Sequence, residues 1–466
     1  MVLIQHDRYS HNRGGTRVMN GIEHNSIVRQ YLDRICSQIK VKSMHEEIRL
    51  EILSHLEDLV AEKVESYGKT EGEAIGEALN QMGDPDSVGK QLNNAHKLKI
   101  EWSVLALVVC MLVIGLVTLY SLKFAMDEHL LFERKMIFVT LGIALMSSLY
   151  FFDYRRLLHY SRIVYVITLL LMFAAQWHGP QISGAKQWIA IGSFDFNVYA
   201  VSPYFLILAA AGMLQTEQPN QFENWKGIIT QFLKSALVYM VFPACFYITA
   251  PAFASLIIYS ISLGILLLVN KKWKLLLIGV GFIPLFILTQ MVLYPRSWEY
   301  SWERYTAFIH PDLINGGYYI IRSVEAIHTG GMWGQGFGIE TRRLPLISSE
   351  LTFSYLVYSL GWVFGITVVV LTLLFISRII RMGMNLHDGY AKGLVVGLTT
   401  VIGIQFVWNL LMCIGMLPIL GGMQLPLLNW SKNTLIELGA VGLMLSIYRR
   451  KDLLGSSHQV QTNKVV

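Results

Sequence analysis

Ten apolar stretches, each of a length that can cross a lipid bilayer, follow residue 102 and limit this chain to one class of fold. A membrane-crossing helix needs about 20 apolar residues, because lipid offers its backbone no hydrogen-bond partners. The chain is 53% hydrophobic and 15% charged, whereas about 25% of a typical soluble protein is charged. We predict an all-α polytopic membrane protein with about ten transmembrane helices, at 103–122, 136–152, 163–176, 198–214, 232–248, 253–269, 275–293, 352–376, 393–416 and 435–448.

The basic residues between these stretches predict which side of the membrane each link faces. The polar N-terminus has no visible signal peptide, so the residues before the first apolar stretch are expected in the cytoplasm. The C-terminal tail, 450–466, is then also cytoplasmic, and the large loop 295–351 is extracellular. Arg134 and Lys135 are exceptions at an outer end, which we interpret as cations facing a protein cavity or an anionic headgroup. The links that satisfy the positive-inside rule contain Arg155, Arg156, Arg162, Lys226, Lys271, Lys272, Lys274, Arg378, Arg381, Arg449, Arg450 and Lys451.

The first hundred or so residues divide into a tail and a helical domain. Residues 1–25 have no periodic apolar pattern, and we predict that they are disordered. Residues 26–98 predict a small cytoplasmic helical domain, with capping boxes at Ser43/Glu46 and Thr70/Glu73. The segment EEIRLEILSHLEDL resembles the helical prefix domain of some bacterial permeases, which implies a regulatory or docking role. A bundle that merely packs is the alternative.

The interval from Tyr300 to Gly361 is the longest polar, glycine-rich stretch between apolar segments. Loops longer than about 15 residues are usually functional or disordered, and the mixture of glycine, aromatic and apolar residues argues against disorder. The interval also brings together cations and carboxylates. We therefore expect it to contain the working surface of the protein, on the side of the membrane that has no access to cytoplasmic ATP.

Several motifs, in order, resemble the SEDS family of peptidoglycan polymerases, the RodA, FtsW and SpoVE type. Phe152-Asp153-Tyr154-Arg155-Arg156-Leu157 is similar to an internal Asp-Tyr segment, and Gly184-Ala185-Lys186-Gln187-Trp188-Ile189 to an outer Gly-Ala-basic-x-Trp-Ile motif. The match extends over nearly all of residues 103–449. Its remaining positions are Arg304, Pro311, Gly317, Tyr318, Ser323, Ala326, Ile327, Thr329, Gly330, Gly331, Gly334, Gly336, Gly338, Leu344, Pro345, Asn409, Gly415, Pro418, Gly422, Leu425 and Pro426.

The resemblance implies a ten-span glycosyltransferase that polymerises lipid II outside the membrane, usually with a transpeptidase partner of the class B penicillin-binding proteins. Lipid II is a disaccharide peptide linked to undecaprenyl pyrophosphate. Such chemistry needs cations for the leaving phosphates and a carboxylate that takes a proton from the acceptor hydroxyl. Alignment from Leu344-Pro345 makes Glu350 the candidate catalytic base. The candidate substrate-binding residues are Lys186, Trp188, Arg304, Arg322, Arg342 and Arg343.

The chain departs from the family pattern at several positions. Ser348-Ser349-Glu350-Leu351 replaces His-x-Asp-Phe, so the acid is one methylene longer. Asn197-Val198-Tyr199-Ala200 replaces Gln-Pro-Ser-Glu, and the following Lys falls on Pro203. Other family polar groups are replaced at Ala252, Tyr319 and 431–434. The alternative function is therefore a catalytically weakened scaffold or regulator of cell-wall synthesis, and the choice among elongation, division and sporulation stays open.

Other classes of function find little support in the sequence. The formal net charge of +6 is carried mainly by links between apolar spans, so no nucleic-acid partner is predicted. The four cysteines are far apart and form no disulfide or zinc pattern. His328 has no partner at ligand spacing, and no strand precedes the glycines at 330–338, so we predict neither a metal nor a nucleotide site, and no cofactor. No apolar span carries the paired charges of a proton-coupled transporter.

Overall fold

The computed structural model describes residues 22–39, 45–95, 101–126, 129–182, 185–192, 194–217, 225–293, 295, 302, 306–309, 311–312, 317–341, 343–386, 388–429 and 431–451. The chain divides into two compact units, one made of residues 1–99 with 450–466 and the other of residues 100–449. Most of the tail that we predicted to be disordered, residues 1–21, lies outside the described residues, as does Ser43 of the first predicted capping box.

The first unit is a helical bundle whose apolar stripes face one another. A 3-10 turn (Ile22–His24) precedes α1 (Ser26–Gln38), α2 (His45–Tyr67), α3 (Glu71–Met82) and α4 (Pro85–Ala95). Ile22 is 1% exposed and belongs to the core, so the predicted disorder is corrected for residues 22–25. The second capping box is confirmed at the start of α3, where the Glu73 carboxylate accepts from the Thr70 N–H over 3.4 Å and the Thr70 side chain accepts from the Glu73 N–H.

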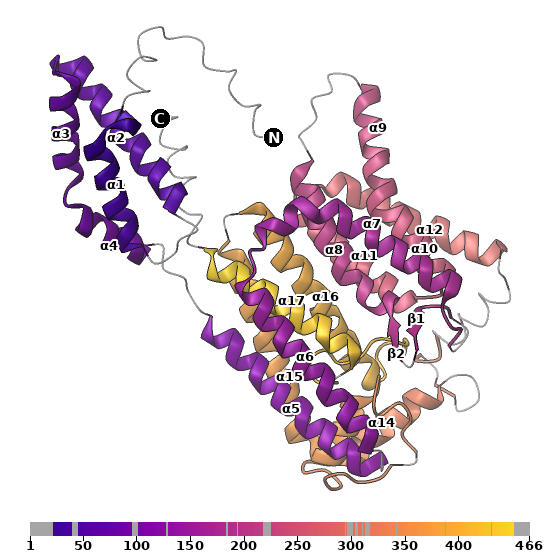
Figure 1. Cartoon of the computed structure of the whole chain (residues 1–466). Coiled ribbons are helices and arrows are strands. Elements are labelled where there is room, and N and C mark those ends of the chain that lie inside the picture. The colour runs from indigo at the N-terminus through magenta and orange to yellow at the C-terminus, as the bar shows by residue number, and fades with distance from the viewer. Residues whose placement is uncertain are drawn as a thin grey trace. The chain divides into compact units, whose positions relative to one another are not determined.

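The second unit has a helix at each of the ten predicted stretches (Figure 1). Seven of the described helices are long and apolar enough to cross a membrane. The third stretch was predicted over 163–176, but the helix there has 24 residues. The prediction was too short because the first turns of this helix carry basic residues, which a hydropathy pattern excludes. The bounds are α5 (Trp102–Met126), α6 (His129–Phe151), α7 (Arg155–His178), α8 (Val198–Thr216), α9 (Trp225–Ala236), the π-helix η4 (Leu237–Val241), α10 (Phe242–Thr249), α11 (Phe253–Val269), α12 (Trp273–Leu293), α14 (Tyr318–Gly330), α15 (Thr352–Met384), α16 (Gly389–Cys413) and α17 (Lys432–Arg449).

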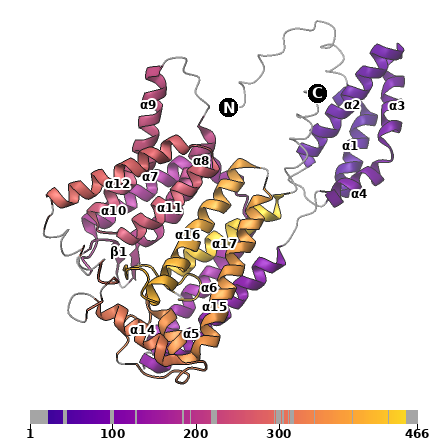
Figure 2. The same ribbon diagram turned by 180° about the vertical axis from the view of Figure 1, so that it is seen from behind.

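The centre of this unit is α8, which packs against α7, α11 and α16 (Figures 1 and 2). In its apolar window 78% of residues are buried, compared with 17% in α6 and 22% in α7. The outer helices therefore turn large apolar side chains such as Leu141, Leu170 and Leu373 outward. So much exposed apolar surface is costly in water and neutral in lipid, which agrees with a membrane-embedded bundle.

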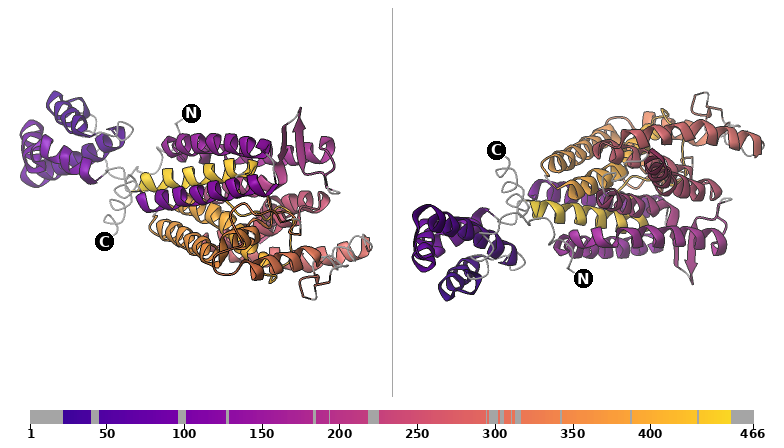
Figure 3. Two further views of the ribbon diagram at one scale, coloured as in Figure 1. Left: turned by 90° about the horizontal axis from the view of Figure 1, so that it is seen from below. Right: turned by 90° about the horizontal axis from the view of Figure 1, so that it is seen from above.

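A short β-hairpin interrupts the predicted all-α fold. Strands β1 (Trp188–Ile191) and β2 (Phe194–Asn197) pair antiparallel, with Trp188 opposite Asn197. The hairpin connects the end of α7 to the start of α8 and lies beyond the ends of these two helices (Figure 3). We call this the hairpin end of the bundle. At the opposite end the Tyr154 hydroxyl donates to Asp388 over 3.2 Å and joins the start of α7 to that of α16.

Helix α15 is broken at Gly361, where a glycine-rich loop inserts its backbone. Gly361 has φ of 86° and ψ of 173°, outside the helical region. The loop supplies the missing hydrogen bonds, since Trp362 N–H donates to Gly331 C=O over 2.9 Å and Gln335 N–H to Tyr358 C=O over 2.9 Å. The glycines of this loop allow its tight turns and its close approach to α15. The backbone groups at the break therefore find partners inside the protein, which irregular backbone at membrane depth requires.

Gly361→Ala is expected to lower the free energy of unfolding by at least ~2 kcal/mol, since a positive φ strains an L-residue. A Cβ atom at this position would also lie 2.3 Å from the Met332 carbonyl oxygen. Thermal unfolding of the purified protein in detergent measures the loss. Gly281→Ala in α12 is the matched control, because its Cβ would meet nothing within 4 Å. Equal stability of the two variants would contradict the account of the break.

Candidate active site

Glu350 ends a tight turn that leads into α15. Pro345 has no N–H, and the next residue, Leu346, has φ of 53°. The Leu346 carbonyl accepts from the N–H groups of Ser349 and Leu351 over 3.1 and 3.0 Å. The Thr352 hydroxyl donates to the carbonyls of Ile347 and Ser349 over 3.0 and 2.9 Å. These bonds fix the backbone from which the Glu350 side chain projects.

The Glu350 carboxyl group is held against the loop that follows α16. Its side chain is largely buried, at 9% exposure, and Oε1 accepts from the Gly422 N–H over 2.9 Å. Gly422 has φ of 93°, which aims its N–H at the carboxylate in a conformation that favours glycine. Among the described residues this neutral N–H is the one donor to the carboxyl group, which leaves lone pairs for a further partner, as acceptance of a proton would require.

Asn409 of α16 fastens the two sides of this site together. Its side chain is fully buried, and Nδ2 donates both to the Glu350 carbonyl, over 2.9 Å, and to the Met423 carbonyl, over 2.7 Å. The Cys413 thiol, one turn later, lies 3.8 Å from the same Glu350 carbonyl. Because Asn409 bonds main-chain atoms on both segments, it fixes the position of Glu350 relative to Gly422.

Lys135 is a site residue that the sequence-based assignment did not include. Its Nζ donates to the Ser348 carbonyl over 3.4 Å and to the Asn429 carbonyl over 3.1 Å. Asn429 in turn donates to the Ser349 carbonyl over 3.3 Å. The cation therefore faces the protein, which agrees with the cavity interpretation of the basic pair at 134–135, whereas Arg134 is exposed. The sequence feature that could have identified Lys135 is its position as a cation at the predicted outer end of an apolar span.

A buried carboxyl group supports the same loop from α17. Glu437 is 3% exposed, and its Oε2 accepts from the Leu427 N–H over 2.7 Å. Leu427 has φ of 62°, a conformation that a leucine rarely adopts without such support. Glu437, Asn429 and Asn409 together anchor residues 422–429, the segment that supplies the donor to Glu350.

Four of the predicted substrate-binding residues, Lys186, Trp188, Arg322 and Arg343, lie in the part of the chain that the structure describes. Lys186 is exposed before β1, and Trp188 is half-buried on it. The Arg322 guanidinium donates to Glu325 of its own helix over 2.6 Å, and this contact raises its pKa. Arg343 is exposed, and its carbonyl accepts from the Tyr318 hydroxyl over 3.4 Å. Arg304 and Arg342 lie outside the described residues, and among the others no hydrogen bond or ion pair joins these side chains to Glu350.

The positions that depart from the family pattern have structural partners of their own. Asn197 caps α8, with Oδ1 accepting from the Ala200 N–H over 2.9 Å, and Pro203 is buried inside that helix. The Tyr199 hydroxyl donates to the Met172 carbonyl over 3.2 Å. Lys432 pairs with Asp195 over 2.5 Å and thereby connects α17 to the hairpin. The described part of the chain contains no group of three or more His, Cys, Asp or Glu residues able to hold a metal ion.

Comparison with known proteins supports the family indicated by these motifs. Residues 100–453 match the family model described as cell cycle protein, which covers FtsW, RodA and SpoVE. A probable peptidoglycan glycosyltransferase FtsW of Geobacter sp. (strain M18) is 26% identical over 74% of this chain and 96% of its own length. Stage V sporulation protein E of Bacillus subtilis is 25% identical over 73% and 94%, and the peptidoglycan glycosyltransferase MrdB of Escherichia coli K12 is 24% identical over 78% and 96%.

Solved structures share the fold of the second unit. A chain of a peptidoglycan synthase complex, whose description concerns the coordination of polymerization and crosslinking, aligns with a TM-score of 0.62 and 22% identity. The alignment covers 76% of this chain and 99% of that one. The rod shape determining protein RodA of Thermus thermophilus aligns with a TM-score of 0.55 and 20% identity, over 76% and 98% of the two chains.

Proposed function

The chain belongs to the FtsW/RodA/SpoVE family of cell cycle proteins, and from this membership we propose that it is a membrane peptidoglycan glycosyltransferase of cell-wall synthesis. Its proposed substrate is lipid II. The relatives named above as peptidoglycan glycosyltransferases support the reaction class. The observation that carries the proposal is the Glu350 carboxyl group, buried at the family's acid position with one backbone donor.

In the proposed reaction Glu350 is the general base. It takes the proton from the acceptor sugar hydroxyl as that oxygen forms a bond to the anomeric carbon of the donor. The bond from this carbon to the pyrophosphate oxygen breaks, and undecaprenyl pyrophosphate leaves with the electron pair. A positioned base typically accelerates such a step by about 100- to 10,000-fold. The test is formation of glycan strands from lipid II by the purified protein.

Lys135 is our candidate for a cation that stabilises this site, and its replacement tests that role. Lys135→Met is expected to lower the polymerisation rate at least ~10-fold, because a charged donor to two carbonyls beside Glu350 is lost, and a tenfold loss needs only about 1.4 kcal/mol. Initial rates with purified variants measure the effect. Arg134→Met is the matched control, since the exposed Arg134 is the adjacent residue. Wild-type rates in both variants would exclude Lys135 from the site.

The proposed orientation places the N-terminal unit and the C-terminal tail in the cytoplasm, and Glu350 at the outer face of the membrane. The positive-inside pattern supports it, because Arg378 and Arg381 lie near the end of α15 that is opposite Glu350. Accessibility of single cysteines to a membrane-impermeant reagent tests it. Labelling from outside at residue 381 but not at residue 343 would contradict the orientation.

For the helical unit of residues 26–98 we propose a regulatory or docking role. Deletion up to Lys97 with unchanged activity and localisation would argue against it. A class B penicillin-binding protein transpeptidase is the proposed partner, supported by the similarity to a chain of a peptidoglycan synthase complex.

A catalytically weakened scaffold is the second candidate function. The replaced family positions support it, because Tyr199 and Pro203 are buried core residues and Lys432 is bound to Asp195. Normal lipid II binding without polymer would favour the scaffold.

A further inference from the structure

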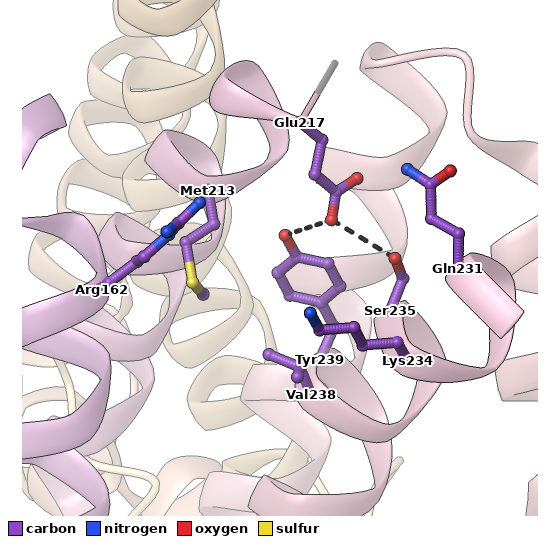
Figure 4. Close-up of a pocket in the computed structure, with 8 residues that line it drawn as sticks. All are labelled: Arg162, Met213, Glu217, Gln231, Lys234, Ser235, Val238 and Tyr239. Carbon is purple, nitrogen blue, oxygen red and sulfur yellow. Dashed lines mark hydrogen bonds between the residues drawn. The ribbon is translucent and has the colours of Figure 1, made fainter. Parts of the chain in front are cut away.

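A pocket of about 380 Å³, lined by both polar and apolar side chains, lies at the end of the bundle opposite the hairpin. Arg162 comes from the second turn of α7, and Glu217 follows the end of α8. The hairpin joins the other ends of these two helices. Since α8 has 19 residues, the pocket is roughly 28 Å from the hairpin, about the thickness of the bilayer core. The pocket therefore cannot be part of the Glu350 site. Figure 4 shows the residues that line it, Arg162, Met213, Glu217, Gln231, Lys234, Ser235, Val238 and Tyr239.

One wall of the pocket is a built π-helical segment, η4. Pro243 has no N–H, and the Phe242 N–H donates to the Leu237 carbonyl, so the carbonyls of Val238 and Tyr239 lose their helical donors. Two tyrosine hydroxyls replace them, with Tyr165 of α7 bonded to Val238 and Tyr259 of α11 bonded to Tyr239 over 2.6 Å. Such π segments are frequent at functional sites. Here the segment holds Ser235, Val238 and Tyr239 at the pocket.

The acidic group of the pocket is already occupied. Glu217 Oε1 accepts from the Tyr239 hydroxyl over 2.8 Å and from the Ser235 hydroxyl over 3.3 Å (Figure 4). Its Oε2 pairs with Lys272. Among the described residues, neither Arg162 nor Lys234 is within ion-pair distance of a carboxylate. The pocket thus keeps two cations for a negatively charged ligand.

Gln231 provides an acceptor of a different kind. Its Oε1 is buried and has no hydrogen-bond partner among the described residues, a state that costs free energy unless a ligand donor or water fills it. A ligand that carries a hydroxyl group as well as a phosphate would satisfy both Gln231 and the cations. The two features together favour a hydroxyl-bearing phosphodiester over a simple inorganic anion.

The helix beside the pocket presents an apolar stripe to its surroundings. Ile229, Leu233 and Leu237 recur at every fourth residue and are 43%, 61% and 43% exposed. Ile229 and Leu233 lie on α9, which supplies Gln231, Lys234 and Ser235 to the pocket, and Leu237 is the first residue of η4. A lipid would place its acyl chains against this stripe and its headgroup among the polar side chains. Basic pockets between transmembrane helices bind anionic headgroups in this way.

We propose that this pocket binds the headgroup of an anionic phospholipid with a glycerol phosphodiester, of which phosphatidylglycerol is the simplest. Arg162 and Lys234 contact the phosphate, and Gln231 accepts a hydrogen bond from the glycerol. In the orientation proposed above the site lies in the cytoplasmic leaflet. It is independent of catalysis by Glu350.

Lipid retention by the full-length protein, measured by native mass spectrometry after reconstitution with phosphatidylcholine and phosphatidylglycerol, tests this site. Wild type is expected to retain phosphatidylglycerol preferentially. Arg162→Gln with Lys234→Gln should reduce that preference roughly 25-fold, the effect of two basic contacts at a membrane surface. The matched control is Arg378→Gln with Arg381→Gln, exposed cations near the same end of the bundle, which should keep the preference. Thermal unfolding of each variant establishes that it is folded.

A second variant tests the chemistry of the headgroup. Phosphatidic acid lacks the glycerol headgroup and its hydroxyls, so wild type should retain phosphatidylglycerol in preference to it. Gln231→Leu should reduce this preference and leave binding of both anionic lipids measurable. Equal loss in the pocket and control variants would overturn the proposal and indicate diffuse surface attraction. Stabilisation by soluble glycerol 3-phosphate without lipid retention would contradict the assignment to a lipid. No preference in wild type would also overturn it.

Discussion

Glu350→Gln is expected to lower the rate of lipid II polymerisation by about 100- to 10,000-fold, the usual contribution of a general base. The amide keeps an oxygen that can accept from the Gly422 N–H, so the variant removes the basicity and preserves the bond that holds the side chain. Stability should therefore change little. Initial rates of glycan formation, measured beside thermal unfolding, separate the loss of the base from a loss of fold.

Glu350→Asp is the companion variant, because it restores the acid of the family pattern. The carboxylate is retained but withdrawn by one methylene, and a displacement of about 1 Å can cost ~100-fold in rate. We expect a rate between those of wild type and Glu350→Gln. Ser349→Ala, which alters the neighbouring side chain only, should stay near wild type. Glycan formation that survives Glu350→Gln would remove Glu350 as the base.

Asn409→Leu is expected to lower the free energy of unfolding by about 2–5 kcal/mol, since each buried group left without its partner costs about 1–3 kcal/mol. The carbonyls of Glu350 and Met423 both lose the donor that Asn409 supplies. Without the Asn409 link between the Glu350 and Met423 carbonyls, the Glu350 turn should shift, and polymerisation should fall in parallel. Thermal unfolding and initial rates on one preparation measure both effects.

Gln405→Leu is the matched control for Asn409→Leu. It lies one turn earlier on α16, it is 6% exposed, and its Nε2 donates to the Tyr204 hydroxyl over 3.2 Å, the one bond of this atom within the described part of the chain. Its loss should affect stability less and leave the Glu350 turn in place. If the two variants lose the same stability and neither loses activity, Asn409 does not position the site.

Runs of apolar residues predicted the positions of the membrane helices well, because a long apolar run indicates a segment that is buried in lipid or in protein. The same pattern failed at the start of α7, where Arg155 and Arg162 are part of a helix that hydropathy truncates. It also could not predict the π-helical segment, which depends on Tyr165 and Tyr259 from other helices.

The candidate site was predicted in part, through the alignment of motifs that placed Glu350 after Leu344-Pro345. The contacts by which Asn409 and Lys135 hold the segments around Glu350 could not be predicted in the same way. Asn409 and Lys135 bond main-chain carbonyls, and a carbonyl carries no sequence signal. The predicted substrate-binding cations were chosen by their charge and their place in the motifs. Arg322 is instead paired with Glu325, a contact that depends on the side-chain rotamers of α14.

The most direct test of the account is whether the purified wild-type protein forms glycan strands from lipid II, alone or with a class B penicillin-binding protein. We predict polymer in at least one of these conditions. No polymer in any of them, from folded protein that still binds lipid II, would contradict the enzyme and favour the scaffold.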